Sequence, residues 1–356
     1  MLDKKMGNAD KEMYTNYIDS DMSQKLNIMK FIFMIMIVFI HSHALPELAF
    51  DLNVPKYVDI CKDIVVEGIC RVAVPSFFLI SGILMYSKDF TWISNMKKKV
   101  RSILVPYFLI NTFWIVFFKG MQMFYVTASY FSGETYQIIG LNGMIKAYLA
   151  PIPLYYPFWF LRDLFIVNIF AKGIELLVRR LPIVAVMVML GIELHVIPIP
   201  LVVDSSAFGM FFMGCLLVNY RLQIQKTDKF PIVYLSVLYI ALAAARLFLP
   251  DVEGVMLVYV IIGSLFWYRI SGIVVNSKTA SIILWCAQFS FFIYAFHEFY
   301  EAMLKKIIMS VLPQYGFVQL MEFFVLPIMV TCICIMVGAF MKKNLPVLYR
   351  IVCGSR

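Results

Sequence analysis

Long apolar runs recur along the whole of this 356-residue chain, and they constrain its fold more than any other feature. Runs of about 18 residues or more are long enough to cross a lipid bilayer as helices. Hydrophobic residues make up 62% of the sequence and charged residues only 15%. A soluble globular protein has about half apolar and about a quarter charged residues. The pattern therefore excludes a soluble protein and predicts an all-α membrane protein.

We expect about ten transmembrane helices in one bundle, with both termini cytoplasmic. Residues 1–25 are polar and are expected to form a disordered cytoplasmic tail. Residues 26–345 are expected to form the membrane domain, and residues 346–356 a short cytoplasmic tail. A break at Pro75 is predicted inside the second helix. The predicted helices are Leu26–Leu45, Val58–Tyr86, Val100–Gly120, Phe158–Val178, Ile183–Ile197, Ser206–Asn219, Ile232–Leu249, Val252–Val275, Ala280–Tyr300 and Phe317–Met341.

Lysine and arginine residues gather on one side of this layout. If the N-terminus is cytoplasmic, the inner segments hold clusters such as Lys97-Lys98-Lys99, whereas the outer segments hold only Lys56, Lys146, Lys305 and Lys306. Such asymmetry is typical of membrane proteins, whose cytoplasmic loops are enriched in cations. The net charge of +9 is then explained by topology, and no nucleic-acid partner is expected.

Neither the seven cysteines nor any motif of a known soluble enzyme predicts a metal site, a disulfide framework or a hydrolase site in this chain. No two cysteines form a CxxC pair, so neither a disulfide framework nor a metal site is expected. The sequence also lacks a Gly-rich phosphate loop, an HExxH motif and a GxSxG motif.

The first apolar run carries a cation and two histidines, which are costly in a membrane helix and usually functional. Eleven helical steps bring His41 back to within roughly 20° of Lys30, about 16 Å further along the axis. His43 points to nearly the opposite side. Lys30 and His41 therefore share one helical face.

Polar residues near the predicted spans fall into two layers. The inner layer holds Lys30, Lys97, Lys98, Lys99 and Arg101, which either anchor the helices at the interface or form a basic mouth for an anionic ligand. The outer layer holds His41, Glu67, Arg71, Arg162, Asp163, Glu193, His195, His297, Glu298 and Glu301.

Each outer residue also has a purely structural interpretation. Glu67 and Arg71 are spaced to neutralise each other on one helix face. Arg162 and Asp163 are adjacent and diverge by about 100°, so we expect partners on other helices. His297 has Tyr294 and Glu301 within helical reach and would then be a satisfied core histidine. Two histidines and an arginine at one depth favour a functional site.

Six motifs in order along the chain resemble those of the integral-membrane acyltransferases often called acyltransferase 3, which include bacterial polysaccharide O-acetyltransferases. Lys30 stands where arginine is frequent in that family, and Asn27 where an acidic residue is common. The matching motifs are Lys30 with His41, Arg71-Val-Ala-Val-Pro75-Ser-Phe-Phe-Leu-Ile-Ser81-Gly82, Arg101-Ser-Ile-Leu-Val-Pro106-Tyr107, Pro157-Phe-Trp159-Phe-Leu-Arg162-Asp163-Leu, Phe211-Phe-Met-Gly214 and Ser290-Phe-Phe-Ile-Tyr294-Ala-Phe-His297.

The resemblance implies an acyl-CoA donor, usually acetyl-CoA, and an acceptor hydroxyl on a cell-envelope glycan or lipid-linked sugar. It implies a multi-pass protein of the bacterial cytoplasmic membrane. His41 would act as general base or transient acyl carrier. Arg71 and Arg162 would orient it or stabilise the oxyanion, and His297 would be a second orienting group or acceptor contact. Lys30, Lys98 and Arg101 would bind the CoA phosphates.

Two other functions fit the same buried polar residues. A transporter or flippase for a glycan or small anion would line its path with them, although no internal repeat of the transporter type is visible. A membrane scaffold in polysaccharide export, with a degenerate site, is the third interpretation.

Overall fold

The structure is a computed structural model of the chain, and it describes residues 17–44, 54–124, 140–149, 155–199, 203–250, 252–313 and 315–354. Every element of regular structure in these ranges is a helix, which confirms that the fold is all-α. Residues 1–16 of the expected N-terminal tail lie outside the described residues.

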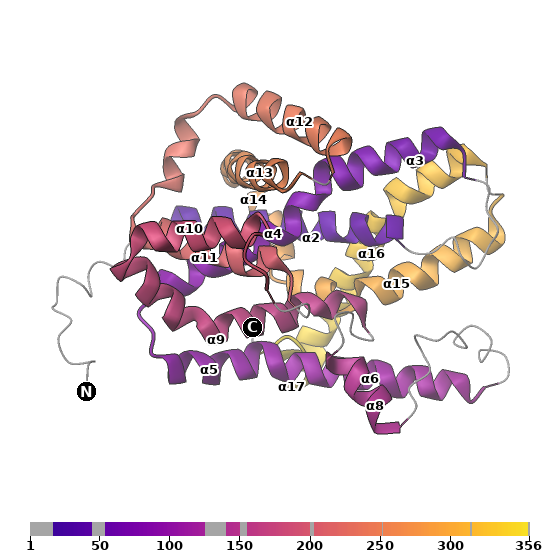
Figure 1. Cartoon of the computed structure of the whole chain (residues 1–356). Coiled ribbons are helices and arrows are strands. Elements are labelled where there is room, and N and C mark those ends of the chain that lie inside the picture. Colours follow the sequence, from indigo (N-terminus) through magenta and orange to yellow (C-terminus); the bar gives the residue numbers. More distant parts are fainter. Residues whose placement is uncertain are drawn as a thin grey trace.

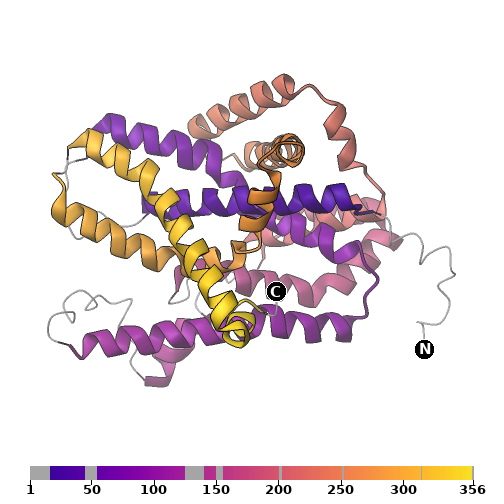
Figure 2. The ribbon, with the colours of Figure 1, turned by 180° about the vertical axis from the view of Figure 1, so that it is seen from behind.

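Helix α2 (Ser20–Ala44) runs through the middle of the bundle (Figure 1). Ile28, Phe33 and Val38 lie on different sides of it, and none has exposed surface. A helix that is apolar and buried all round is a core helix, and α2 organises the others. Figure 2 shows α16 crossing it obliquely. Its helix neighbours include α4 (Ala73–Tyr86), α13 (Glu253–Val275), α14 (Ala280–Ala287), α15 (Ser290–Val311) and α16 (Gly316–Asn344).

The polar N-terminal end of α2 is anchored to the segment η8 (Ile224–Lys229), so the helix begins before the predicted Leu26. Buried Lys25 pairs with Asp21 at 2.5 Å and with Asp228 at 2.7 Å. The Tyr17 hydroxyl donates to the carbonyl of Leu222 at 2.7 Å. Burial raises the pKa of Tyr17 to about 12, so this hydroxyl keeps its proton at neutral pH.

The second apolar segment is helical throughout but irregular in its middle. It comprises α3 (Lys56–Asp63), the π-helical η2 (Ile64–Ile69), the 3₁₀ turn η3 (Cys70–Val72) and α4. The predicted break at Pro75 is displaced upstream. Proline lacks an N–H and its ring crowds the carbonyl four residues earlier, so the irregularity falls before it. Pro75 itself sits in the first turn of α4.

The third segment repeats this arrangement. Helix α5 (Trp92–Lys99) leads through the π-helical η4 (Val100–Leu104) into α6 (Val105–Gln122), and Pro106 lies in the first turn of α6. The segment starts before the predicted Val100 because the Thr91 hydroxyl caps α5 by accepting from the Ser94 amide at 3.3 Å. Helix α8 (Gly140–Leu149) packs beside α6.

The fourth to sixth segments are the 3₁₀ turn η7 (Tyr156–Phe158) with α9 (Trp159–Arg180), then α10 (Pro182–Glu193) and α11 (Ser205–Asn219). Helix α11 packs closely on α4 because glycines face each other there. A Cβ atom on Gly214 would lie 2.7 Å from the Ile83 amide nitrogen and 2.8 Å from the Cα of Gly82. Two of the sequence motifs, those ending at Gly82 and Gly214, therefore meet at one helix crossing.

The last segments are α12 (Ile232–Phe248), α13, α14, α15, α16 and α17 (Pro346–Val352). A single helix was expected over Ala280–Tyr300, but α14 and α15 are bent by 70°. The bend contains neither glycine nor proline. Instead, Gln288 donates to the Trp285 carbonyl and Ser290 to the Ala287 carbonyl, so side chains bind oxygens near the bend.

Among the residues that the structure describes, five helices are long and apolar enough to cross a membrane, or six if the bent pair α14 and α15 is one span. Helices α10, α11 and α12 are apolar but shorter. Large apolar side chains are exposed on outer helices, such as Phe113 and Val116 on α6 and Val237 and Ile240 on α12. Such faces suit a lipid environment. The count of ten spans and the orientation of the termini stay predictions.

Candidate active site

Two histidines that are far apart in the sequence meet inside the bundle. His41, in the last turn of α2, and His297, on α15, have ring centroids 4.9 Å apart with planes at 72°. His41 is 8% exposed and His297 is fully buried. The sequence placed both at one depth, and the structure brings them into contact.

The surroundings of His297 leave one of its nitrogens available. Its Nδ1 lies 3.0 Å from the carbonyl oxygens of Ile293 and Tyr294 and donates to this pair. A neutral ring that donates through Nδ1 carries its lone pair on Nε2. Within the described ranges that buried Nε2 has no hydrogen-bond partner. Neighbours on its own helix therefore provide hydrogen-bond partners for one ring nitrogen of His297, as the structural interpretation predicted, but not for the other.

The turn η7 covers the histidine pair with an aromatic ring. Tyr156 lies edge-on to His41, with centroids 5.5 Å apart. Two contacts fix the turn to α15: the Tyr294 hydroxyl donates to the Pro157 carbonyl, and Phe158 stacks on Tyr294 with centroids 5.5 Å apart. The motif that opens the fourth segment and the motif of the ninth are therefore joined beside His41.

Arg71 borders this cluster from η3. Its guanidinium binds Glu67, with an Nε–Oε1 distance of 2.9 Å, which confirms the predicted pair. The Arg71 side chain is 43% exposed, and its charge acts on both the His41 imidazole and the Tyr156 hydroxyl. The pair is therefore more than a neutralised surface contact.

Arg162 and Asp163, which were expected to need partners on other helices, also pair with each other. The Arg162 Nε donates to Asp163 Oδ1 at 2.9 Å, because its long side chain folds back on its neighbour. Asp163 also reaches another element, since its Oδ2 accepts from the Asp204 amide at 2.9 Å. This buried pair joins the start of α9 to the start of α11, and Arg162 acts electrostatically on Tyr107 of α6.

A cavity of about 1000 Å³ opens between α2, α4, α5, α9 and α15. Lys30, Lys88, Lys98 and Lys99 line one part of it, and Ile37, Phe160 and Tyr294 line another. Ile37 is one helical turn before His41 on α2, and Tyr294 is one turn before His297 on α15. We call the first part the basic end of the cavity and the second part its deep end. The deep end therefore lies one turn from both histidines.

Arg101 differs from the two lysines grouped with it in the sequence. It lies exposed on η4 and is not among the residues that line the cavity, although Ser102 next to it is. The position of Lys30 and Lys98 on the cavity wall agrees with the predicted basic mouth.

The other sequence candidates have different partners. His43 pairs with Asp63 at 3.4 Å. His195 is exposed and contacts Ser205 and Glu253, whereas Glu193 is buried against Gly209. Fully buried Glu301 lies near Ser42, whose carbonyl accepts from Lys305. In the part of the chain that the structure describes, no three His, Cys, Asp or Glu side chains are placed to hold a metal ion.

Sequence reasoning missed two residues beside the candidate site. Tyr156 was hidden among many aromatic residues and carried no signal of its own. Arg246, which binds Glu67, did carry one, because it is a cation inside the apolar run of the seventh helix.

Comparison with known proteins identifies the family. The model of the acyltransferase domain of the acyltransferase 3 family matches residues 23–339, which include all six motifs, both histidines and the cavity-lining residues of α2, α4, α5, α9 and α15. The chain belongs to the acyltransferase 3 family. The resemblance drawn from the motifs is thereby confirmed.

Within this framework one curated relative is informative. The chain is 24% identical over 221 residues to the succinoglycan biosynthesis protein ExoH of Rhizobium meliloti (strain 1021). The match covers 60% of this chain and 58% of that protein. No solved structure matches the chain significantly.

Proposed function

We propose that this protein is a membrane-embedded O-acyltransferase that moves an acyl group from acyl-CoA, in the first place acetyl-CoA, to a hydroxyl of a cell-envelope glycan or lipid-linked sugar. Membership of the acyltransferase 3 family supports the reaction class. Similarity to a protein named for succinoglycan biosynthesis supports a glycan acceptor. The cation distribution supports a bacterial cytoplasmic membrane location with both termini inside.

The observation that carries this proposal is the position of the histidine pair, one helical turn beyond Ile37 and Tyr294 on the wall of a cavity that lysines also line. Lysines at the basic end suit the phosphates of CoA, and the apolar deep end suits its pantetheine arm and thioester. The cavity volume of about 1000 Å³ is in the range of small-molecule sites. A thioester at the deep end would lie about one helical turn from His41.

His41 is the proposed base. Its lone pair takes the proton of the acceptor hydroxyl while that oxygen bonds to the thioester carbonyl carbon. The carbon–sulfur bond then breaks, and the imidazolium returns the proton to the leaving CoA thiolate, so atoms and charge balance. Arg71, which acts electrostatically on His41, would stabilise the negative charge that develops on the carbonyl oxygen.

His297 and Arg162 have supporting roles in this scheme. The Nε2 of His297 is buried and carries a lone pair. It would accept a hydrogen bond either from the acceptor hydroxyl or from the ring N–H of His41. Arg162, tied to Asp163, would fix the start of α9 and thus the turn η7 that covers His41. Lys30 and Lys98 would bind the CoA phosphates.

The test is acyl transfer by the purified full chain in lipid nanodiscs, with radiolabelled acetyl-CoA or succinyl-CoA and a lipid-linked glycan acceptor. Label should move to the acceptor, and His41→Ala should abolish transfer. His43→Ala, two residues away with its ring paired to Asp63, is the matched control and should keep activity.

Two results would refute the proposal. One is full transfer by the His41→Ala protein, which would remove the proposed base. The other is movement of the unmodified glycan across a proteoliposome membrane without acyl transfer, which is the behaviour of a transporter.

A further experiment separates the acyl-carrier route from direct transfer. The protein is incubated with donor alone and quenched, and mass spectrometry then tests whether His41 is acylated.

A further inference from the structure

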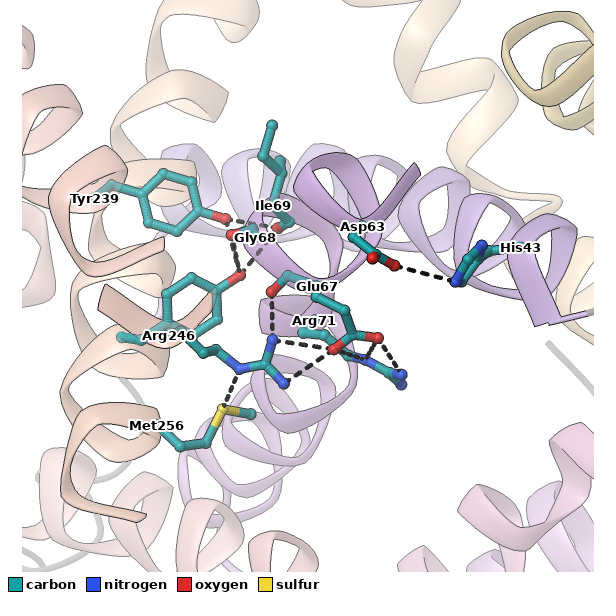
Figure 3. Close-up of polar contacts among 10 residues, drawn as sticks. His43, Asp63, Glu67, Gly68, Ile69, Arg71, Tyr239, Arg246 and Met256 are labelled. Atoms are coloured by element: carbon teal, nitrogen blue, oxygen red, sulfur yellow. Dashed lines mark hydrogen bonds and ion pairs between the residues drawn. The ribbon is translucent and has the colours of Figure 1, made fainter. Parts of the chain in front are cut away.

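The irregular segment of residues 64–72 is held by side chains from two other helices (Figure 3). Arg246 on α12 donates to the Glu67 carbonyl. The Tyr259 hydroxyl on α13 binds the Gly68 carbonyl at 2.9 Å, and the Tyr239 hydroxyl on α12 binds that of Ile69 at 2.7 Å. Three consecutive carbonyl oxygens of the non-α segment thus receive side-chain donors, which fixes its path.

The Glu67 carboxylate is shared between two arginines. Arg71 binds it at 2.9 Å through Nε, and Arg246 binds its Oε2 at 3.1 and 3.2 Å through its two terminal nitrogens. Two guanidinium groups against one carboxylate leave one net positive charge. Arg246 is the better buried of the two, with 14% of its side chain exposed against 43% for Arg71.

Arg246 is itself held firmly in place. Its Nε donates to the sulfur of Met256 at 3.3 Å, and its guanidinium lies 5.8 Å from the ring centroid of Tyr259. A guanidinium fixed on several sides has little freedom left to lose when it binds a carboxylate. Arg71 nevertheless binds both oxygens of Glu67, each at 2.9 Å from its Nε, so Arg246 adds a second cation to the carboxylate without displacing the first.

The network ends beside the candidate active site, because η3, which carries Arg71, packs on α2, which carries His41. We propose that Arg246 is a positioning residue: by sharing Glu67, it sets the position and the effective charge of Arg71 beside His41. This inference rests on the proposed acyltransferase function and adds to it a residue on α12 that does not line the cavity. Without Arg246, the Glu67–Arg71 pair would carry no net charge, and less positive charge would be available to the reacting carbonyl.

The experiment compares Arg246→Gln, Arg246→Lys and the wild-type chain in nanodiscs, with kcat and the KM for acyl-CoA measured separately. Arg246→Gln should lower kcat by about 10- to 100-fold and leave the donor KM within about 2-fold, since only the transition state carries the new charge. Arg246→Lys restores one cation to Glu67 and should recover part of kcat.

Tyr239→Phe is the matched structural control. It removes a hydrogen bond to the same irregular segment, at Ile69, and leaves the Glu67 ion pairs in place. If Arg246 only stabilises the fold, the two variants will lose thermal stability alike and keep similar kcat values. The positioning role predicts that kcat falls in Arg246→Gln alone, measured below the unfolding temperature of both proteins.

The double variant Glu67→Gln with Arg246→Gln gives the sharpest outcome. Removing the carboxylate releases Arg71, so the double variant should be more active than Arg246→Gln alone, which is the sign of coupling between the two sites. Wild-type kcat in Arg246→Gln, or a double variant no more active than Arg246→Gln alone, would overturn this inference while the proposed function stands. A wild-type chain that transfers no acyl group would overturn both.

Discussion

The basic end of the cavity and the histidine pair beside its deep end are built in different ways. At the basic end, four lysines from α2, from α5 and from the link between α4 and α5 face a shared space, and Lys98 is exposed. Beside the deep end, two buried imidazoles are in direct contact, and η7 is fixed over them by specific bonds. A diffuse cluster of charges tolerates the loss of a member, whereas a contact between two rings does not.

The largest effect should come from breaking the histidine pair. We expect His297→Ala to lower kcat by about 100-fold, or about 3 kcal/mol, because it removes the ring that contacts His41. Steady-state kinetics in nanodiscs measure it. His195→Ala, which changes an exposed ring beside Ser205, is the control and should keep wild-type kcat. Equal kcat values for His297→Ala and His195→Ala would show that the contact between the His41 and His297 rings does not contribute to catalysis.

A smaller effect, on KM rather than kcat, should follow when the basic end is altered. The double change Lys30→Gln and Lys98→Gln should raise the KM for acyl-CoA by about 10-fold, which corresponds to roughly 0.7 kcal/mol per lysine. Added salt should weaken donor binding by the wild type more than by the double variant, because the charges are partly screened. A fall in kcat with an unchanged KM would contradict the division between the two ends.

Arg101 gives a finer test of the same division. Because it lies outside the cavity lining, Arg101→Gln should change the donor KM by about 2-fold or less, below the effect of Lys98→Gln. Both residues are exposed cations near the same helix end, but only Lys98 lines the cavity. The comparison therefore separates direct contact with the bound donor from a general effect of nearby positive charge. A larger effect at Arg101 would mean that CoA lies across η4.

Two substitutions at Tyr156 should have small but different effects on kcat. Tyr156→Phe keeps the ring that lies edge-on to His41 and should leave kcat within about 2-fold, since the contact is made by the aromatic ring. Tyr156→Ala should lower kcat by about 5-fold, because an edge-to-face contact contributes about 1 kcal/mol. If Phe and Ala variants lose activity equally, the hydroxyl, rather than the ring, is the working group.

Local sequence patterns predicted most helix positions because each helix is set by its own residues. Thus α9 begins at Trp159 where Phe158 was expected, and α11 begins at Ser205 where Ser206 was expected. The break predicted at Pro75 was misplaced and the irregular segment before Pro106 was not predicted, because the strain at a proline is relieved upstream of it. The bend between α14 and α15 was missed because Gln288 and Ser290 leave no breaker signal in the sequence.

The candidate site was predicted as a set of residues but not as a set of contacts. Shared depth placed His41 and His297 in one layer, yet depth says nothing of which faces meet. The contact of 4.9 Å depends on how α15 packs on α2. Arg246 shows the same limit, because its bond to Glu67 joins residues 179 positions apart. Periodicity along a chain carries no information at that separation.

The most direct test of the account is photolabelling with two acyl-CoA analogues in nanodiscs, one with a photoreactive group on the acyl chain and one with it on the adenine. The account predicts that the acyl-chain probe labels α2 and α15 next to His41 and His297, that the adenine probe labels the stretch with Lys88 and Lys98, and that free CoA competes with both. Labels in the reverse positions, or labels confined to the lipid-facing side of α6, would contradict it.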